Sequence, residues 1–276
     1  MLRPGLRITE VCDEHGGAIM SLAREDPVLN AFIIYDWVEL RHRCRFYLAL
    51  REPSGDLEAL CLIYPGERFD TLIPRGSQEG VRTLLAKIEV PEKAVFPILR
   101  AEEANIVLEV LGPRAGPIYD ALLMACSPRD FRPRVAHDVV RLGPEHAELF
   151  RRFFAEERGE RGYRPTLEQA RERLGDEKRP VFAVIKGGRI VSLALIFLRT
   201  QDVAFVGGVY TVPEFRNMGL ATSTTSRATE EALKLSRLAA LIVRADNAPA
   251  IRVYEKIGYK LHERIKWICA GLDYSP

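Results

Sequence analysis

The chain has 276 residues, of which 47% are hydrophobic, and its formal net charge at pH 7 is only +2. This length allows one large or two ordinary domains of a globular protein. The small net charge gives no general reason to expect nucleic acid or an anionic membrane as a partner. The apolar runs fall short of the ~20 residues that span a membrane, and the N-terminus lacks a signal-peptide segment. We therefore expect a soluble, cytoplasmic protein.

Cysteine and histidine are scattered along the chain and form no metal-binding spacing. The five cysteines are odd in number and include no C-x-x-C pair: they are Cys12, Cys44, Cys61, Cys126 and Cys269. This pattern favours free thiols in a reducing compartment over a disulfide scaffold or a zinc site. We expect no metal.

The first half of the chain alternates strands with helices. Its apolar periodicity predicts these elements: a strand over 7–11, helices over 14–24 and 28–40, strands over 44–50, 57–64 and 68–73, a helix over 78–88, a strand over 94–99, a helix over 102–111 and a strand over 118–126. The apolar spacing of 118–126 would also fit a helix. Residues 127–134 have the composition of a loop. We place a domain boundary there, which gives domains of residues 1–134 and 135–276.

The second half repeats that order of elements. Its pattern predicts a strand over 135–142, a helix over 144–156, a charged loop over 158–163, a helix over 166–174, strands over 181–185, 190–198 and 203–212, a helix from Leu220, a strand over 238–243, a helix that ends at Gly258 and a strand over 260–269. The Gly-Gly pair at 187–188 is typical of a hairpin. The two halves share an architecture but little residue identity.

The segment from Val209 to Thr222 is predicted to be a strand, a turn and a helix start. Gly207 and Gly208 suggest a bulge or a close backbone approach by a ligand, and Pro213 ends the strand. Free backbone N–H groups at the start of a helix attract an anion. Gly219 has no side chain to keep a phosphate away from them, and Arg216 adds a positive charge.

A second stretch follows the apolar strand over 238–243, whose continuous run suits a central parallel strand. Asp246 or Asn247 can cap the next helix. Apolar residues recur there at helical spacing, and the segment closes with Tyr254-Glu-Lys-Ile-Gly-Tyr259.

Together these stretches resemble the GNAT superfamily of acyl-CoA-dependent N-acetyltransferases. Arg216-Asn-Met-Gly-Leu-Ala221 fits that family's R/Q-x-x-G-x-G/A pyrophosphate loop, and Asn247 to Tyr259 is similar to its second CoA segment. The resemblance covers roughly residues 135–269. Element order alone extends it to the first half, as in the tandem form of glycine N-acyltransferase-like proteins. It implies an α/β (α+β) fold of two GNAT-like lobes, each with a mixed, mostly antiparallel, twisted sheet flanked by helices, the first of them degenerate.

The resemblance also implies how acetyl-CoA binds. The strands over 203–212 and 238–243 would splay apart around the pantetheine arm, and a backbone N–H would polarise the thioester carbonyl. Asn247 would contact the arm or only cap its helix. The residues expected at the cofactor are Val209, Tyr210, Thr211, Arg216, Asn217, Met218, Gly219, Leu220, Ala221, Thr222 and Asn247. In the first half, Pro74–Gly80 has the wrong spacing for a phosphate loop, and Glu79 would repel a phosphate. We therefore expect one CoA per chain.

Tyr254 is the candidate general acid, because a phenol can protonate a leaving thiolate whose conjugate acid has a lower pKa. The family also places its acid on this helix, although a tyrosine there can equally be a packing residue. The sequence does not identify the general base, because some relatives carry a Glu where this chain has Ile242. Glu156, Glu157, Glu160, Asp202, Tyr210 and a chain of water molecules all remain alternatives.

The sequence thus predicts an N-acetyltransferase that transfers an acetyl group from acetyl-CoA to a primary amine by direct attack. The alternatives are transfer of a longer acyl chain to an amino acid, and a CoA-binding or sensing protein without activity. The amine acceptor and the oligomeric state are not defined by the sequence. We also predict that a strand from the first half, around Ile118–Cys126, completes the second sheet.

Overall fold

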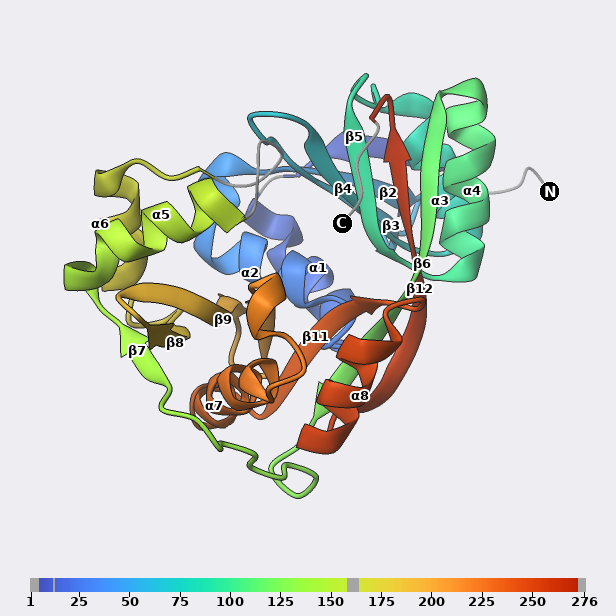
Figure 1. The fold of residues 1–276 in the computed structure, drawn as a ribbon. Coiled ribbons are helices and arrows are strands. Elements are labelled where there is room, and N and C mark those ends of the chain that lie inside the picture. Colours follow the sequence, from blue (N-terminus) through green and yellow to red (C-terminus); the bar gives the residue numbers. More distant parts are fainter. Residues whose placement is uncertain (1–4, 12, 158–163, 273–276) are drawn as a thin grey trace. The chain divides into compact units, whose positions relative to one another are not determined.

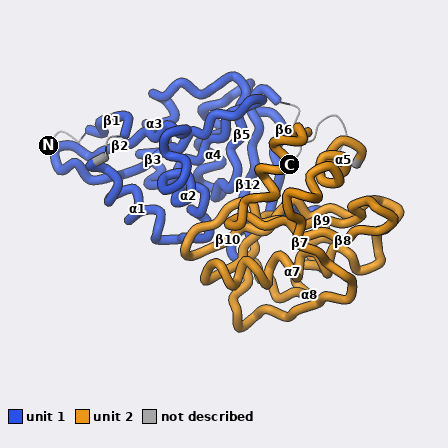
Figure 2. The backbone as a smooth tube through the Cα atoms, turned by 90° about the vertical axis from the view of Figure 1, so that its left-hand side faces the viewer, with its two compact units in different colours: residues 1–123, 243–246, 262–276 blue, residues 124–242, 247–261 orange. Residues whose placement is uncertain are grey.

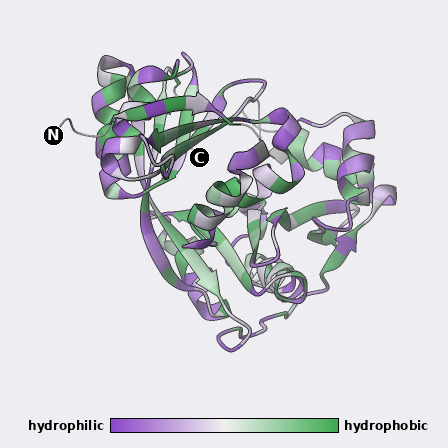
Figure 3. Cartoon of the chain, turned by 180° about the vertical axis from the view of Figure 1, so that it is seen from behind, coloured by the Kyte–Doolittle hydropathy of each residue, from purple (hydrophilic) through white to green (hydrophobic). Residues whose placement is uncertain are grey.

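The computed structural model describes residues 5–11, 13–157 and 164–272. Its α-helices are α1 (Gly16–Arg24), α2 (Ala31–Glu39), α3 (Gln78–Lys87), α4 (Ala101–Leu111), α5 (Ala147–Glu157), α6 (Leu167–Gly175), α7 (Leu220–Leu235) and α8 (Ala248–Ile257) (Figure 1). Its strands are β1 (Leu6–Glu10), β2 (Arg45–Arg51), β3 (Leu57–Tyr64), β4 (Asp70–Gly76), β5 (Ala94–Leu99), β6 (Ala115–Cys126), β7 (Val140–Leu142), β8 (Val181–Lys186), β9 (Arg189–Arg199), β10 (Val203–Thr211), β11 (Leu238–Arg244) and β12 (Lys260–Ala270). The strands are mostly hydrophobic and the connecting loops mostly hydrophilic (Figure 3).

The chain folds into two compact units, and neither is continuous in sequence. Unit 1 contains residues 1–123, 243–246 and 262–276, whereas unit 2 contains residues 124–242 and 247–261 (Figure 2). The roles that the sequence suggests for domains 1–134 and 135–276 stay a prediction.

Unit 1 is a sheet in the order β1-β2-β3-β4-β5-β12-β6. The pairing of β4 with β5 is parallel, and that of β5 with β12 is antiparallel. Alternate residues of the central strands pack on opposite faces, as the two-residue period of a strand dictates. Leu60 and Leu62 pack with Ile19 and Ile33 of α1 and α2. Cys61 belongs to the cluster on the other face, with the apolar residues of α3 and α4.

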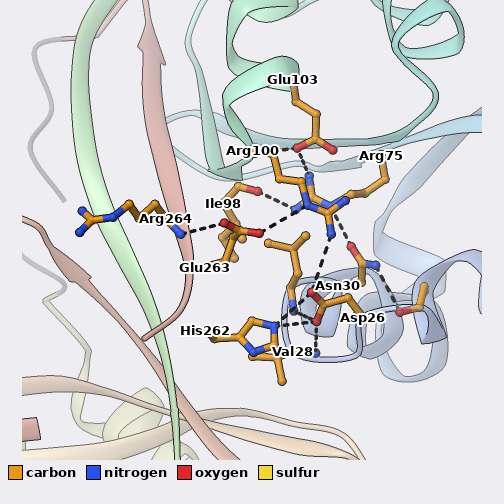
Figure 4. Close-up of polar contacts among 12 residues, drawn as sticks. Asp26, Val28, Asn30, Arg75, Ile98, Arg100, Glu103, His262, Glu263 and Arg264 are labelled. Carbon is orange, nitrogen blue, oxygen red and sulfur yellow. Dashed lines mark hydrogen bonds and ion pairs between the residues drawn. The ribbon is translucent and has the colours of Figure 1, made fainter. Parts of the chain in front are cut away.

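A buried arginine fixes the carboxyl ends of β4 and β5 in unit 1 (Figure 4). Arg75 is 2% exposed, and its guanidinium donates to Asn30 Oδ1 (2.7 Å), Glu103 Oε2 (2.7 Å) and the Ile98 carbonyl (2.6 Å). Glu103 also accepts a hydrogen bond from the backbone N–H of Arg100 at 2.9 Å. A buried charge requires this kind of full pairing. The Arg75 side chain therefore reaches from β4 to β5 beyond the point where the two strands stop pairing, at Thr71 and Val95.

In unit 2 the strands lie in the order β11-β10-β9-β8-β7. The β10–β11 pairing is parallel, whereas the β7–β8, β8–β9 and β9–β10 pairings are antiparallel. Ala183 packs in the cluster under α5 and α6, and the next residue, Val184, packs with Leu220 of α7. The strand next to β11 on the side away from β10 is β6. This confirms the prediction that the strand around Ile118–Cys126 completes the second sheet.

The predicted fold class is confirmed, and the largest local difference lies before β7. We expected a strand over 135–142, but only Val140–Leu142 pair with β8. Upstream, the backbone N–H groups of Arg134 and Ala136 donate to Ser226 Oγ (2.8 Å) and Ser223 Oγ (3.1 Å) of α7. Since these amides bond to helix side chains, they are not available to a strand ladder.

Candidate functional site

The two motif stretches of unit 2 meet at one cavity of about 790 Å³. It lies at the end of β10, along the turn that follows, at the start of α7 and along α8. The lining residues are Val209, Tyr210, Thr211, Phe215, Arg216, Asn217, Gly219, Leu220, Ala221, Thr222, Asn247, Pro249, Ala250, Arg252, Val253, Tyr254 and Lys256. Every residue that the sequence placed at the site is among them except Met218. Met218 is 48% exposed, and its carbonyl lies 2.7 Å from His137 Nε2.

The cavity begins where β10 leaves β11. In the described structure the two strands pair at Val203–Phe205 only. The register of β10 with β9 then shifts between Gly207 and Tyr210, as expected for a bulge. A Cβ atom at Gly207 would lie 2.7 Å from the ring of Phe197, and Gly208 has a φ of 61°. Both positions therefore favour glycine, and the bulge directs the segment from Val209 to Thr211 along the cavity.

The start of α7 supplies the anion-binding features. Gly219 precedes the helix with a φ of 79°, and Ser223 N–H donates to the Gly219 carbonyl at 3.1 Å. The amides of Leu220, Ala221 and Thr222 precede that first hydrogen bond, so they have no acceptor within the helix. Together with the helix dipole, these donors favour a phosphate.

Arg216 is held at the rim of the cavity by the end of β10. Its Nε donates to the Thr211 carbonyl at 3.2 Å, and its guanidinium carbon lies 5.9 Å from the ring centre of Tyr210. The Tyr210 ring in turn packs on Phe153 of α5, with ring centres 5.8 Å apart. Arg216 therefore lines the same cavity as the first residues of α7.

Three hydroxyl groups connect β9, β10 and α7 beneath the cavity. Ser192 Oγ lies 2.9 Å from Thr211 Oγ1 and 3.3 Å from Thr224 Oγ1. The single proton of the Thr224 hydroxyl is shared between the carbonyls of Leu220 and Ala221, both at 3.2 Å. Ser192 and Thr224 are fully buried, which makes their mutual satisfaction necessary. These hydrogen bonds hold the first turn of α7 against the end of β10.

Tyr254 reaches the cavity from α8. Asn247 caps this helix by accepting from the Ala250 N–H at 3.2 Å. Tyr254, three residues before the end of the helix, is 7% exposed, and burial raises its pKa to about 12. Its ring centre lies 6.1 Å from that of Tyr259, which is itself fixed by a 2.9 Å hydrogen bond to Thr229 Oγ1. The phenol therefore stays protonated at neutral pH.

A protein-family model described as the acetyltransferase (GNAT) family matches residues 144–259, which include every lining residue of the cavity. This segment belongs to the GNAT family. The protein is accordingly an acyl-CoA-dependent N-acyltransferase, which uses an acyl-CoA as co-substrate and an amine as acceptor. No curated protein matches the chain.

Solved structures share the fold of nearly the whole chain. A Drosophila protein has a TM-score of 0.71 at 14% identity, over 97% of this chain and 98% of that chain. A GCN5-related N-acetyltransferase from Sphaerobacter thermophilus has a TM-score of 0.66 at 16% identity, over 98% of both chains. A tandem GNAT protein from the clavulanic acid biosynthesis pathway has a TM-score of 0.61 at 14% identity, over 98% of this chain and 100% of that one. At these identities the likeness establishes the tandem architecture alone.

The candidate bases do not gather at the GNAT cavity, with one exception. Glu156 pairs with Arg152 at 3.3 Å on α5, and Asp202 pairs with Arg237 at 3.4 Å. Glu160 lies outside the described residues, as does the side chain of Glu157. Tyr210 lines the cavity. Among the described lining residues there is no Asp, Glu or His.

The sequence analysis missed two basic residues at the cavity, Arg252 and Lys256 of α8. Their spacing of four residues, on a helix that the sequence had already placed, was the available signal. No cluster of metal-binding side chains occurs among the described residues, and no described helix is long and apolar enough to cross a membrane.

Proposed function

We propose that the protein transfers an acetyl group from acetyl-CoA to a primary amine by direct attack, with residues between Val209 and Tyr254 holding the cofactor. One observation carries the proposal: two motifs about 30 residues apart line a single cavity, which combines an open helix N-terminus with a buried phenol. The amides of Leu220, Ala221 and Thr222 and the Arg216 guanidinium would bind the pyrophosphate.

The reaction needs the thioester and the amine held together, with donors aimed at the developing charge. The backbone of Val209, Tyr210 and Thr211 follows the bulge, beyond the pairing with β11, so its polar groups can bond to the pantetheine arm. An N–H group there would stabilise the oxyanion that forms as the amine attacks. Asn247 would contact the arm as well as cap α8.

The amine nitrogen forms a bond to the thioester carbon, and the carbon–sulfur bond then breaks. Tyr254 donates a proton to the leaving thiolate, the nitrogen loses its remaining extra proton as the amide forms, and that proton returns through water to the Tyr254 phenolate. The ammonium form of the acceptor must first lose its proton, since only the free amine is nucleophilic. The described lining contains no carboxylate or imidazole. We therefore propose that this proton leaves through water.

Unit 1 is proposed to bind no CoA. Its β4 and β5 diverge after Thr71 and Val95, as β10 and β11 do after Phe205 and Ala240. In unit 1, however, the buried Arg75 side chain crosses from β4 to the Ile98 carbonyl of β5. The space that would admit a pantetheine arm is thus occupied by the protein's own side chain.

The test measures free thiol released from acetyl-CoA by the full-length protein with a panel of acceptors. The panel contains amino acids, small amines, a peptide with a free N-terminus and a lysine peptide. Turnover with acetyl-CoA that exceeds turnover with octanoyl-CoA supports the proposal. A preference for the long chain would favour the amino-acid acyltransferase. CoA binding without turnover on any amine would favour a sensor, and absence of CoA binding would refute both.

A further inference from the structure

Two basic side chains at the cavity have no partner among the residues that the structure describes. Arg252 and Lys256 are both exposed and both line the cavity from α8. Within the described part of the chain, neither forms an ion pair, a hydrogen bond or a ring contact. Four residues of helix separate them by one turn, a rise of about 6 Å, so they lie on the same side of α8.

Basic residues nearby in the sequence are neutralised by carboxylates. Arg244 pairs with Asp246 at 2.6 Å, Arg227 pairs with Glu230 at 2.6 Å, and Lys260 bonds to Asp130. The lining residues of the cavity include three cations, of which Arg216 is one, and no described carboxylate. The cavity therefore has an excess of positive charge, which favours a ligand with several negative charges.

An acyl-CoA carries such charge in two places, the pyrophosphate and the monoester phosphate on the ribose 3′ oxygen. The proposed function assigns the pyrophosphate to the amides at the start of α7 and to Arg216. The monoester phosphate approaches two negative charges at neutral pH. It needs a second group of donors, and Arg252 supplies a planar fork that suits phosphate oxygens.

We propose that Arg252 and Lys256 form a second anion subsite, which binds the 3′-phosphate of the acyl-CoA. This inference rests on the proposed function and assigns a role to α8 beyond Asn247 and Tyr254. The rival for the same pair of cations is a carboxylate of the amine acceptor. Because both side chains are exposed, the phosphate stays partly hydrated, and the subsite contributes to cofactor selection rather than to the chemical step.

The experiment compares two ligands, CoA and 3′-dephospho-CoA, by calorimetry on the full-length protein. The variants are Arg252→Gln, Lys256→Gln and the double substitution. The matched control is Arg171→Gln, which removes an exposed positive charge of α6 that does not line the cavity. We expect wild type and the control to bind CoA about tenfold more tightly than 3′-dephospho-CoA, as modest charge-assisted contacts predict. The double variant should bind the two ligands almost equally, and the wild-type preference should weaken as salt rises.

The outcomes separate this inference from the proposed function. If wild type binds neither ligand, the acyl-CoA cavity itself is wrong. If wild type binds CoA but the double variant keeps the wild-type preference for CoA, the subsite is refuted and the proposed function stands. A variant with unchanged ligand preference and a raised KM for the amine acceptor would assign the pair to the acceptor carboxylate. Both residues are exposed, so the variants should fold, and a thermal unfolding scan of each verifies this.

Discussion

The substitution Tyr254→Phe tests the proposed acid most directly, because it removes one oxygen atom and keeps the ring. The Phe ring can retain the packing against Tyr259, whose ring centre is 6.1 Å away. We therefore expect near wild-type stability and near wild-type affinity for acetyl-CoA. Positioned general acids typically contribute ~10²–10⁴-fold to rate. The chemical rate constant should fall by a factor in this range, which corresponds to roughly 3–5 kcal/mol of barrier.

The pKa values bear on whether the phenol can do this work. Burial raises the pKa of Tyr254 to about 12. Against an ordinary thiol pKa of about 8.5, proton transfer from such a phenol would be uphill by nearly 5 kcal/mol. Burial acts on sulfur in the same direction, however, since it raises the pKa of the Cys61 thiol to about 12 in this protein. A thiolate expelled beside Tyr254 also loses hydration, which raises the pKa of its conjugate thiol toward the pKa of the Tyr254 phenol.

The assay is single-turnover thiol release at saturating acetyl-CoA, followed across pH. A group with a raised pKa stays protonated until pH rises through about 12, so no loss of rate should occur near the ordinary phenol pKa of about 10. Tyr259→Phe is the matched control. It removes a buried hydroxyl that is 2.9 Å from Thr229 and does not line the cavity. We expect it to cost about 1 kcal/mol of stability and to leave the rate unchanged.

Two results would refute the reasoning. Unchanged single-turnover rates in Tyr254→Phe would exclude the phenol as the acid. An equal loss of rate in Tyr259→Phe would show that packing, rather than proton donation, limits the reaction.

The other predictions concern the cofactor, pH and the two units. Gly219→Glu should abolish CoA binding, because it adds charge and bulk at the start of α7. Arg216→Ala should weaken CoA binding modestly. Normal CoA binding by a folded Gly219→Glu variant, measured by calorimetry, would contradict the phosphate site. Burial raises the pKa of Asp36 from 3.8 to about 7, so its contribution to stability should decline as pH rises through that interval, by up to about 4 kcal/mol. Denaturant titrations of Asp36→Asn should lack that decline. Full-length protein should bind one CoA per chain, and a fragment of residues 135–276, which lacks β6, should aggregate; two equivalent sites or a stable, active fragment would count against this.

The sequence was sufficient for the parts of the site that depend on local backbone chemistry. Gly219 precedes α7 in a left-handed conformation, and Asn247 caps α8, because a glycine turn and a side-chain cap are encoded within a few residues. The same holds for the bulge at Gly207 and Gly208. These features need no knowledge of the rest of the fold.

Features that depend on distant partners were missed. Arg75 was read as part of a failed phosphate loop, but it lies in β4 and is buried against Asn30 and Glu103, from segments 45 and 28 residues away. The segment before β7 was predicted to belong to a strand over 135–142. Its amides instead bond to hydroxyls of α7 that are about 90 residues later. No local pattern reveals such pairings.

The position of β12 has a consequence for how the chain is made. In unit 1, β5 pairs with β4 on one side and with β12 on the other, where Lys266–Ala270 pair with Leu99–Ala94. During synthesis these residues emerge about 170 residues after β5, and slow loop closure must precede their pairing. The edge of β5 that pairs with β12 therefore stays unpaired while unit 2 is translated. Nascent chains arrested near residue 255 should accordingly be protease-sensitive in their first 123 residues, and chaperones should bind there until translation passes residue 270.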